Sequence, residues 1–157
     1  MGQLVGAALN VNEYVFPAVN ASYGETHELL VHFPAGSVDG AAVPAMYIRP
    51  ERDWKDDPGD QSARPAAVCV IYFHANACDI GECLEDMFMV RDGVFDGCAA
   101  VLAPEYAGYG LFSEYEPSVD SIDLVARAAW RFCTGKLGFK SEHIVLWGRS
   151  IGSPAAG

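Results

Sequence analysis

The pattern of apolar and polar residues divides the chain into an irregular start and a regular remainder. Residues 1–26 are only weakly periodic, so we expect an arm that covers other elements rather than a strand. Two short extended runs follow at residues 27–33 and 43–49, and Asp39-Gly40 between them is a strong hairpin-turn signal. Residues 51–64 are charged and interrupted by a Pro-Gly pair, which predicts a solvent-exposed loop.

From residue 67 onward, strand signals alternate with helix signals. Continuous apolar runs are typical of parallel strands covered on both faces. These runs occupy residues 67–73, 99–103 and 144–147. Asp79, with Glu82 three residues later, predicts the start of a helix through a capping box. Residues 122–132 predict a second helix because their apolar side chains recur at helical spacing.

Apolar positions on each predicted helix define the face that should point into the core. On the first helix they are Leu84, Met87, Phe88 and residues 90–94, and on the second they are Ile122, Val125, Ala126, Ala129 and Trp130. Gly93 weakens the far end of the first helix. A hairpin followed by strand–helix–strand–helix–strand predicts an α/β fold, with a mostly parallel, doubly wound sheet and an antiparallel start.

The composition is that of a single folded domain with an acidic surface. A chain of 157 residues with 51% hydrophobic residues can form one core. The net charge of −11 argues against binding of nucleic acid and against a basic patch for membranes. No apolar stretch approaches the roughly 20 residues of a membrane span.

The cysteines favour free thiols over a disulfide framework. They are Cys69, Cys78, Cys83, Cys98 and Cys133. Their number is odd, and the sequence has no Cys-x-x-Cys pair and no histidine at zinc-finger spacing. We therefore expect a protein of a reducing compartment, the cytoplasm, with no metal site and no cofactor.

The strongest chemical signal is Gly148-Arg149-Ser150-Ile151-Gly152, directly after the last apolar run. A Gly-x-Ser-x-Gly sequence after a buried strand is the pattern of a nucleophile elbow, a sharp strand-to-helix turn that exposes a serine hydroxyl. Side chains at Gly148 or Gly152 would collide where the strand and the helix nearly touch. Ser150 is therefore the predicted nucleophile, and an ordinary turn serine is the alternative.

The loop after the first parallel strand carries half of a predicted oxyanion hole. Two backbone N–H groups aimed at one point stabilise the oxyanion of acyl transfer. One is the N–H of Ile151, the residue after the nucleophile. The other is assigned to the backbone N–H of Asn76, in His74-Ala75-Asn76-Ala77.

The other candidate residues receive structural interpretations. His74 precedes the serine and ends a strand, so we expect it to hold its loop rather than act as a base. Asp79 is expected to cap a helix and not to serve as a catalytic acid. Residues 106–110 (YAGYG) are expected to pack as a loop with glycine turns. The histidines expected at the surface or at strand ends are His27, His32 and His143.

Taken together, these motifs resemble the intracellular α/β-hydrolase-domain proteins of the serine-aminopeptidase-type group, and most closely its depalmitoylase-like branch. The matching pieces are residues 72–79 (family pattern H-G-N-A-x-D), 104–110 (D-Y-x-G-Y-G) and 148–153 (G-x-S-I-G-[ST]). Phe16-Pro17 and Ser22-Tyr23 also resemble the arm of some members. These motifs cover roughly residues 15–157. We therefore expect an amino-terminal arm over residues 1–26 and the amino-terminal part of an α/β-hydrolase domain over residues 27–157.

The resemblance implies hydrolysis of acyl esters or thioesters, with protein depalmitoylation as one form. Ser150 would form an acyl-enzyme, a histidine would act as base and an aspartate would orient that histidine. The substrate would be a small molecule or an acylated protein. The protein would lie in the cytoplasm or associate peripherally with the cytoplasmic face of membranes.

Three departures from the family pattern bear on this expectation. Ala75 stands where the family has glycine, and its methyl group could crowd the oxyanion loop. Pro154 follows Ser153 directly, where the family has one more residue, which leaves the register of the next helix open. The amino-terminal cysteine cluster of the depalmitoylase branch does not occur in this sequence, which weakens palmitoyl-protein substrates relative to a generic hydrolase.

In this fold the acid and the histidine of the triad follow the serine in the chain. The sequence after Gly152 reads SPAAG and contains neither. We therefore expect a domain truncated after the nucleophile elbow, without its triad partners and without esterase activity as given. The alternative is a non-catalytic α/β-hydrolase-like interaction module or pseudoenzyme. A nucleotide-binding protein is disfavoured because the sequence has no Gly-rich phosphate motif.

Overall fold

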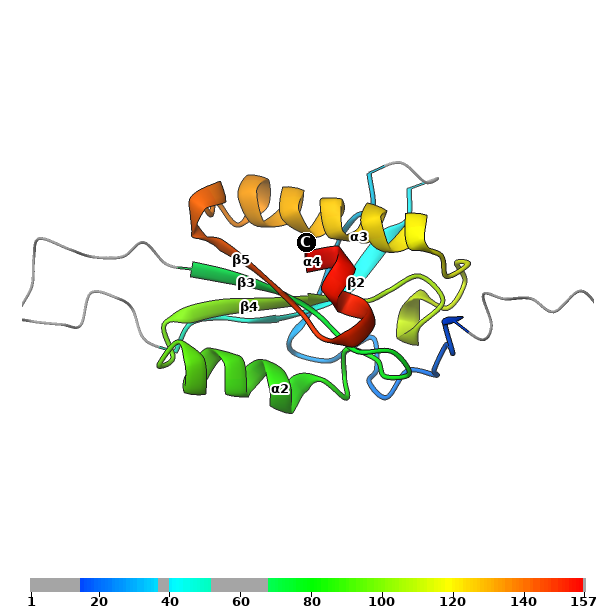
Figure 1. The fold of residues 1–157 in the computed structure, drawn as a ribbon, viewed down its shortest axis with the longest axis horizontal. Coiled ribbons are helices and arrows are strands. Elements are labelled where there is room, and N and C mark those ends of the chain that lie inside the picture. The colour runs from blue at the N-terminus through cyan, green and yellow to red at the C-terminus, as the bar shows by residue number, and fades with distance from the viewer. Residues whose placement is uncertain (1–14, 37–39, 52–67, 157) are drawn as a thin grey trace, which may run out of the picture.

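A five-stranded sheet lies between two helices in the computed structural model, which describes residues 15–36, 40–51 and 68–156 (Figure 1). The strands are β1 (Leu30–Pro34), β2 (Ala42–Ile48), β3 (Val68–Phe73), β4 (Ala99–Pro104) and β5 (Ile144–Gly148). The α-helices are α2 (Leu84–Met89), α3 (Val119–Arg131) and α4 (Ser153–Ala156). Shorter helical turns are Val90–Val94, Gly110–Phe112, Phe132–Lys136, Ser141–His143 and Ser150–Gly152.

The strand order is β1-β2-β4-β3-β5. The β1–β2 and β2–β4 pairs are antiparallel, whereas β3 is parallel to both β4 and β5. The predicted α/β fold with an antiparallel start is therefore confirmed, and the described sheet is mixed, with two parallel and two antiparallel strand pairs. The turn residues of the hairpin at 37–39 and most of the predicted loop at 51–64 lie outside the described residues.

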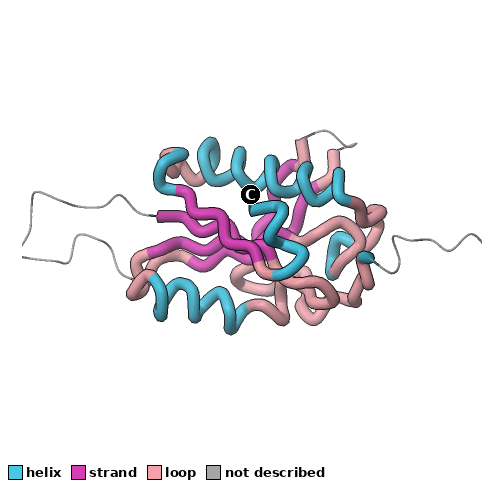
Figure 2. Tube along the Cα trace, in the orientation of Figure 1, coloured by secondary structure: helices cyan, strands magenta, loops and turns pink. Residues whose placement is uncertain are grey.

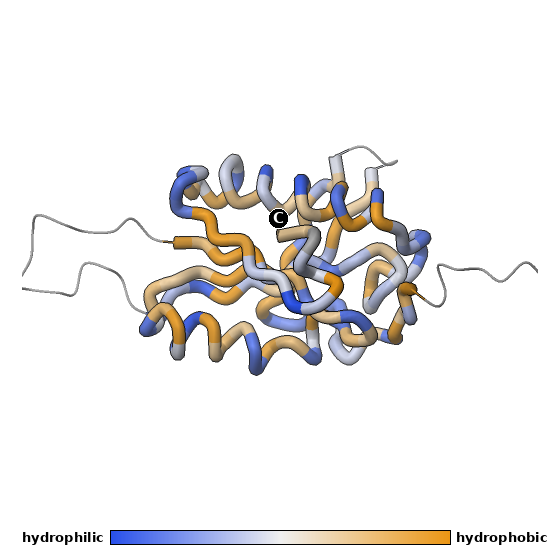
Figure 3. The backbone as a smooth tube through the Cα atoms, in the orientation of Figure 1, coloured by the Kyte–Doolittle hydropathy of each residue, from blue (hydrophilic) through white to orange (hydrophobic). Residues whose placement is uncertain are grey.

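The sheet buries an apolar layer on each face, because successive strand residues point to opposite sides. On β3, Cys69, Ile71 and Phe73 join the core under α3, and Val70 and Tyr72 join the core over α2. Figure 2 shows α3 and α2 on opposite faces of the strands, and Figure 3 shows the hydrophobic residues concentrated along the strands between them. These two layers make β3 a fully covered strand, as its apolar run predicts.

Helix α3 forms where the sequence predicts it and has a clear start signal. The Ser118 side chain accepts from the backbone N–H of Ser121, and the Ser121 hydroxyl accepts from the backbone N–H of Ser118, which completes a capping box. The buried face differs slightly from the prediction. It contains Ile122, Val125, Ala128 and Ala129, while Ala126 and Trp130 are half-buried.

The start of the first predicted helix is wrong: α2 begins at Leu84 and not at Asp79. Side-chain oxygens hold the preceding residues in turns, because Asp79 accepts from the N–H of Glu82 and Glu105 accepts from the N–H of Ile80. Its predicted apolar face is also too wide. Of the residues predicted on this face, Met87 and Val90 are buried, whereas Phe88 and Val94 are exposed. The end of this helix loosens into a π-helical turn at Val90–Val94, which contains Gly93.

Strand β5 forms one end of the sheet. β5 pairs with β3 and lies at the end of the strand order. The predicted apolar strand at 144–147 is present, and Leu146 and Trp147 on it are exposed. Among the described residues, no helix combines the length and the apolar character needed to cross a bilayer.

Candidate active site

The predicted site centres on the turn between β5 and α4. Ser150 is exposed and has a φ of +54°, in the left-handed region that side-chain-bearing residues rarely adopt. Its neighbours hold this turn close to the sheet, since the N–H of Arg149 donates to the carbonyl of Phe73 at 3.0 Å. The N–H of Gly152 donates back to the carbonyl of Arg149 at 3.0 Å. The strained backbone at Ser150 is therefore fixed by main-chain bonds on both sides.

The two glycines flanking this turn lie where the sequence argument expects a close approach. A Cβ atom on Gly148 would stand 2.3 Å from the carbonyl oxygen of Gly152. A Cβ atom on Gly152 would stand 2.4 Å from the carbonyl oxygen of Phe73. Both neighbours are backbone atoms, so no side-chain movement could make room.

The predicted oxyanion loop leaves the sheet beside this turn. Phe73 at the end of β3 is the register partner of Gly148 at the end of β5, and the two strands are parallel. The loops that follow these strands, residues 74–77 and 149–152, therefore start side by side at the carboxyl ends of the strands. This is where α/β folds place their ligands.

Three bonds within the protein hold the Asn76 side chain in place. Its amide nitrogen donates to the carbonyl of Val15 at 2.8 Å, and its amide oxygen accepts from the Tyr109 hydroxyl at 2.6 Å and from the N–H of Ala77 at 3.2 Å. This arrangement leaves the backbone of Asn76, not its amide, for any role toward a substrate.

The backbone strain in this loop lies at Ala77 and not at Ala75. Ala77 has a φ of +58°, and Ala75 is not among the described residues with positive φ. The alanine that replaces the family's glycine is therefore accommodated without a left-handed backbone.

Beneath the loop, His74 and Glu105 form a buried ion pair. The His74 Nε2 lies 3.1 Å from Glu105 Oε1, and both side chains are fully buried. The contact is an ion pair rather than an aligned hydrogen bond. Burial alone would lower the pKa of His74, but the Cys78 thiol, the Glu105 carboxylate and the Ala75 carbonyl favour the charged ring and raise its pKa to about 9. His74 thus has the structural role predicted for it.

Glu105 is the centre of this buried network, and sequence reasoning missed it. Its carboxylate accepts from the Tyr23 hydroxyl at 2.9 Å, from the N–H of Ile80 at 3.3 Å and from the N–H of Tyr106 at 3.2 Å. Burial, together with the charge of Glu105, raises the pKa of Tyr23 and keeps its hydroxyl a donor. A buried carboxylate needs this many donors to offset its lost hydration. Its position directly after the β4 run was the available signal.

Tyr106 and Tyr109 fix the histidine ring, as the packing interpretation of residues 106–110 predicts. Their ring centroids lie 4.0 and 5.9 Å from that of His74. The Tyr106 hydroxyl donates to the His74 carbonyl at 3.0 Å. Gly110 leaves room for the network, because a Cβ atom there would stand 2.3 Å from a carboxylate oxygen of Glu105.

The Asp79 carboxylate is buried and binds both the arm, at Ser22, and the turn before α2. Its carboxylate accepts from the hydroxyl of Ser22 at 2.6 Å and from the backbone N–H of Ser22. The same carboxylate accepts from the N–H of Glu82 at 2.9 Å. Asp79 therefore caps a turn and a segment of the arm, and the described part of the arm, residues 15–26, contains no strand.

The side chain of Arg149 turns toward α2. Its guanidinium donates to Asp86 at 2.6 Å, and the Tyr72 hydroxyl donates to the same carboxylate oxygen at 3.0 Å. These contacts link Arg149, the residue before Ser150, to Asp86 on α2.

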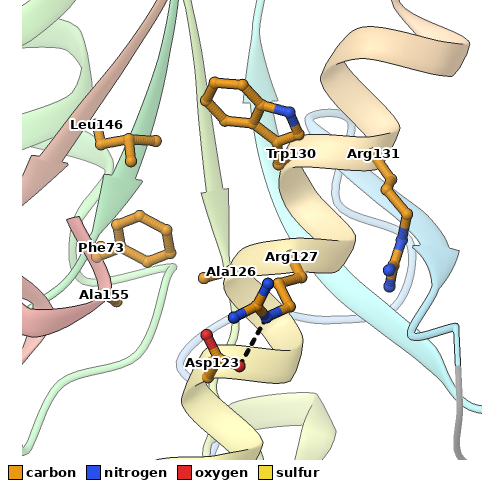
Figure 4. Close-up of a pocket in the computed structure, with 8 residues that line it drawn as sticks. All are labelled: Phe73, Asp123, Ala126, Arg127, Trp130, Arg131, Leu146 and Ala155. Atoms are coloured by element: carbon orange, nitrogen blue, oxygen red, sulfur yellow. Dashed lines mark hydrogen bonds and ion pairs between the residues drawn. The ribbon is translucent and has the colours of Figure 1, made fainter. Parts of the chain in front are cut away.

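A groove of about 510 Å³ opens between α3, β5 and α4 (Figure 4). Its walls are mainly apolar, with Phe73, Leu146 and Trp130 facing it from three elements. Asp123 and Arg127 form an ion pair of 2.7 Å at its margin. The groove exposes the apolar face of β5 on the α3 side of the sheet.

Comparison with known proteins agrees with the fold and the motifs. The sequence matches no established family profile. It is 32% identical over 114 residues to alpha/beta hydrolase domain-containing protein 17C of Xenopus tropicalis, which covers 73% of this chain and 32% of that protein. It is 31% identical over 113 residues to the human protein 17C, covering 71% of this chain and 33% of that protein. The chain therefore spans about a third of the length of the curated relatives it matches.

A solved structure has the same fold. The thermostable carboxylesterase EstE1, cloned from a metagenomic library, matches with a TM-score of 0.55 at 19% identity, over 93% of this chain and 44% of that one. At this identity the match shows the fold alone. The strand order, the motif similarity and this structural match identify an α/β-hydrolase fold in its amino-terminal part.

Proposed function

We propose that this member of the α/β-hydrolase family is a serine hydrolase of acyl esters or thioesters, with Ser150 as its nucleophile. The observation that carries the proposal is the exposed Ser150 at a φ of +54°, on a turn whose flanking glycines pack against backbone. A strained, exposed serine at the end of a parallel strand is the geometry that nucleophilic catalysis in this fold uses. An ordinary surface turn would not need two glycines at such close approach.

The reaction proceeds by acyl transfer. The Ser150 hydroxyl attacks the substrate carbonyl and gives its proton to a histidine base. The backbone N–H groups of Asn76 and Ile151 donate to the oxyanion that forms, and one such donor is worth roughly 3 to 4 kcal/mol. The histidine then protonates the departing alcohol or thiol. Water then attacks the acyl-enzyme and gives its proton to the histidine, and the histidine returns that proton to the Ser150 oxygen as the acid leaves.

The base is assigned to no histidine of this chain. His74 is fully buried against Glu105, and His27, His32 and His143 lie before the nucleophile in the chain. In this fold the acid and the base follow the nucleophile. The proposal accordingly concerns the protein at its natural length.

The finer assignment is a long-chain acyl thioester on a protein, with peripheral association at the cytoplasmic face of a membrane. The motifs support it through their resemblance to the depalmitoylase-like branch. A thioester and an ester share the same oxyanion, so the Ser150 site serves both.

Labelling by a fluorophosphonate probe tests the nucleophile. We expect the protein at its natural length to be labelled, Ser150→Ala to abolish labelling, and Ser153→Ala, a matched change three residues away, to retain it. Labelling that survives Ser150→Ala would refute the assignment. Hydrolysis of a short aryl ester compared with a long-chain acyl thioester then measures which substrate class is preferred.

A non-catalytic interaction module is the second candidate. The observation that favours it is the edge strand β5, whose Leu146 is exposed in the apolar groove and whose Trp147 is exposed on the other face of the sheet. A folded, natural-length protein that resists the probe and hydrolyses neither substrate would favour this candidate.

A further inference from the structure

Three ligand-bearing side chains converge beneath the proposed oxyanion loop. His74, Cys78 and Cys83 each place one ligand atom so that all three atoms lie within 4.8 Å of one another. They come from ten consecutive residues, and their spacing, H-x3-C-x4-C, matches none of the common zinc patterns. This is why the cysteine pattern in the sequence predicts no metal site.

We propose that His74, Cys78 and Cys83 bind a soft divalent cation, Zn²⁺, as two thiolates and one imidazole. The Sγ atoms of Cys78 and Cys83 lie 3.8 Å apart. Two thiolates bound to a tetrahedral zinc ion at about 2.3 Å stand about 3.8 Å from each other. The separation of the two sulfur atoms in the structure equals that of two thiolates bound to one zinc ion.

The imidazole lies on the same side of the cluster. The Nδ1 atom of His74 is 3.9 Å from Cys78 Sγ, slightly more than the roughly 3.6 Å between a nitrogen and a sulfur ligand of one zinc ion. Nδ1 and the Cys78 thiol now both contact the carbonyl of Ala75, at 3.0 and 2.9 Å. Binding would release the thiol protons and the proton on Nδ1. The Ala75 carbonyl or a water would take the fourth position.

A second, independent feature supports the site: the other ring nitrogen of His74 faces a carboxylate. Metal-binding histidines usually direct their free N–H to a carboxylate or a carbonyl, which sets the tautomer and the ring orientation. Here Glu105 lies 3.1 Å from Nε2. The Tyr106 ring packs on the imidazole at 4.0 Å between centroids, which fixes its plane. These contacts set the ring orientation, with Nδ1 on the side of the Cys78 thiol.

The position of the cluster gives the ion a structural effect. His74 directly follows β3, and Cys83 directly precedes α2. An ion held by these residues would link the ends of the segment that carries Asn76. Zinc at this site would stabilise the loop, and this inference does not depend on Ser150 being a nucleophile.

Direct metal titration tests the inference. The protein is reduced with a phosphine, stripped with a chelator and titrated with Zn²⁺ against a chromophoric chelator. We expect one ion to bind per chain. Cys78→Ser should weaken the affinity by more than about 100-fold, because removing a metal ligand should cost more than removing a group that only hydrogen-bonds to a ligand. Cys78→Ser retains a hydroxyl for the Ala75 carbonyl, so the fold should persist. Cys98→Ser is the matched control and should bind like the parent.

Cobalt(II) substitution gives a readout independent of activity and of stability. We expect near-ultraviolet thiolate-to-cobalt bands in the parent protein, reduced in Cys78→Ser and in Cys83→Ala and unchanged in Cys98→Ser. Absence of these bands, or zinc affinity in Cys78→Ser equal to that of the parent, would overturn the proposal.

Discussion

Left-handed backbone at residues with side chains marks the two loops of the candidate site. Among the described residues, the non-glycine positions with positive φ are Ala77, Asp96 and Ser150. Ala77 and Ser150 lie on the loops that leave the paired ends of β3 and β5. A Cβ atom in this conformation costs roughly 1–2 kcal/mol, so strain of this kind persists only where the surrounding structure holds it. For Ser150 the strain accompanies exposure of a hydroxyl, whereas at Ala77 it carries no such benefit.

Replacing Ala77 by glycine should therefore stabilise the protein. We expect Ala77→Gly to raise the free energy of unfolding by about 0.5–1 kcal/mol, because relief of the left-handed strain outweighs the added freedom of the unfolded chain. Ala75→Gly is the matched control two residues away. Without positive φ to relieve, it should lower the free energy of unfolding by about 0.4–1 kcal/mol. Urea titration of both variants measures this, and effects of the same sign would contradict the assignment of strain to Ala77.

Between β5 and α4, the position of the Ser150 turn is set by how closely α4 approaches β3. The contact of Gly152 with the carbonyl of Phe73 brings the start of α4 against the end of β3. The main-chain bond from Arg149 to Phe73 fixes the same junction from the other side. The position of Ser150 in the turn therefore depends on both the close packing of Gly152 and the bond from Arg149.

A methyl group at this junction should be costly. We expect Gly152→Ala to lower the free energy of unfolding by about 2–3 kcal/mol, because its Cβ would meet backbone at 2.4 Å. Gly24→Ala is a suitable control, since a Cβ atom there has nothing within 4 Å and its effect should stay within about 0.5 kcal/mol. Thermal unfolding compares the two, and similar midpoints would show that the junction has room.

Element types were readable from the sequence where local signals and tertiary packing agree. The apolar run of β3 and the periodic face of α3 are of this kind, and both elements form as predicted. The start of α2 was not readable, because the donors of that turn bind carboxylates of Asp79 and Glu105 rather than continuing a helix. Glu105 lies 25 residues from Ile80 and 82 from Tyr23, and no local pattern encodes contacts at such separations.

The candidate site divides in the same way. The Gly-x-Ser-x-Gly motif locates the Ser150 turn, since its glycines have a local steric reason. The cluster of His74, Cys78 and Cys83 depends on how the loop after β3 folds back toward α2. That path is set by the arm and by Glu105, so spacing along the sequence could not reveal it.

At the scale of the whole molecule, the arm joins the loops of the site into one unit. The arm contributes the carbonyl of Val15 to Asn76, the hydroxyl of Tyr23 to Glu105 and the carbonyl of Val19 to the N–H of Gly110. These bonds cross from the start of the described chain to both the β3 and the β4 loops. The arm thereby holds the loops after β3 and β4 in place through hydrogen bonds.

Strand β5 is the last strand in the order of the sheet, and its exposed apolar residues predict self-association of the 157-residue chain. Leu146 and Trp147 are 37% and 38% exposed, on a strand that pairs with β3 on one side. An apolar edge strand with unpaired backbone groups is a template for association with another copy. We expect this chain to self-associate at micromolar concentration, and Trp147→Lys to reduce association because a charge on an edge strand opposes pairing. Met89→Lys, at an exposed apolar residue on α2, should leave association unchanged. Size-exclusion chromatography with light scattering measures all three proteins, and a monodisperse parent monomer would show that β5 is not an associating edge.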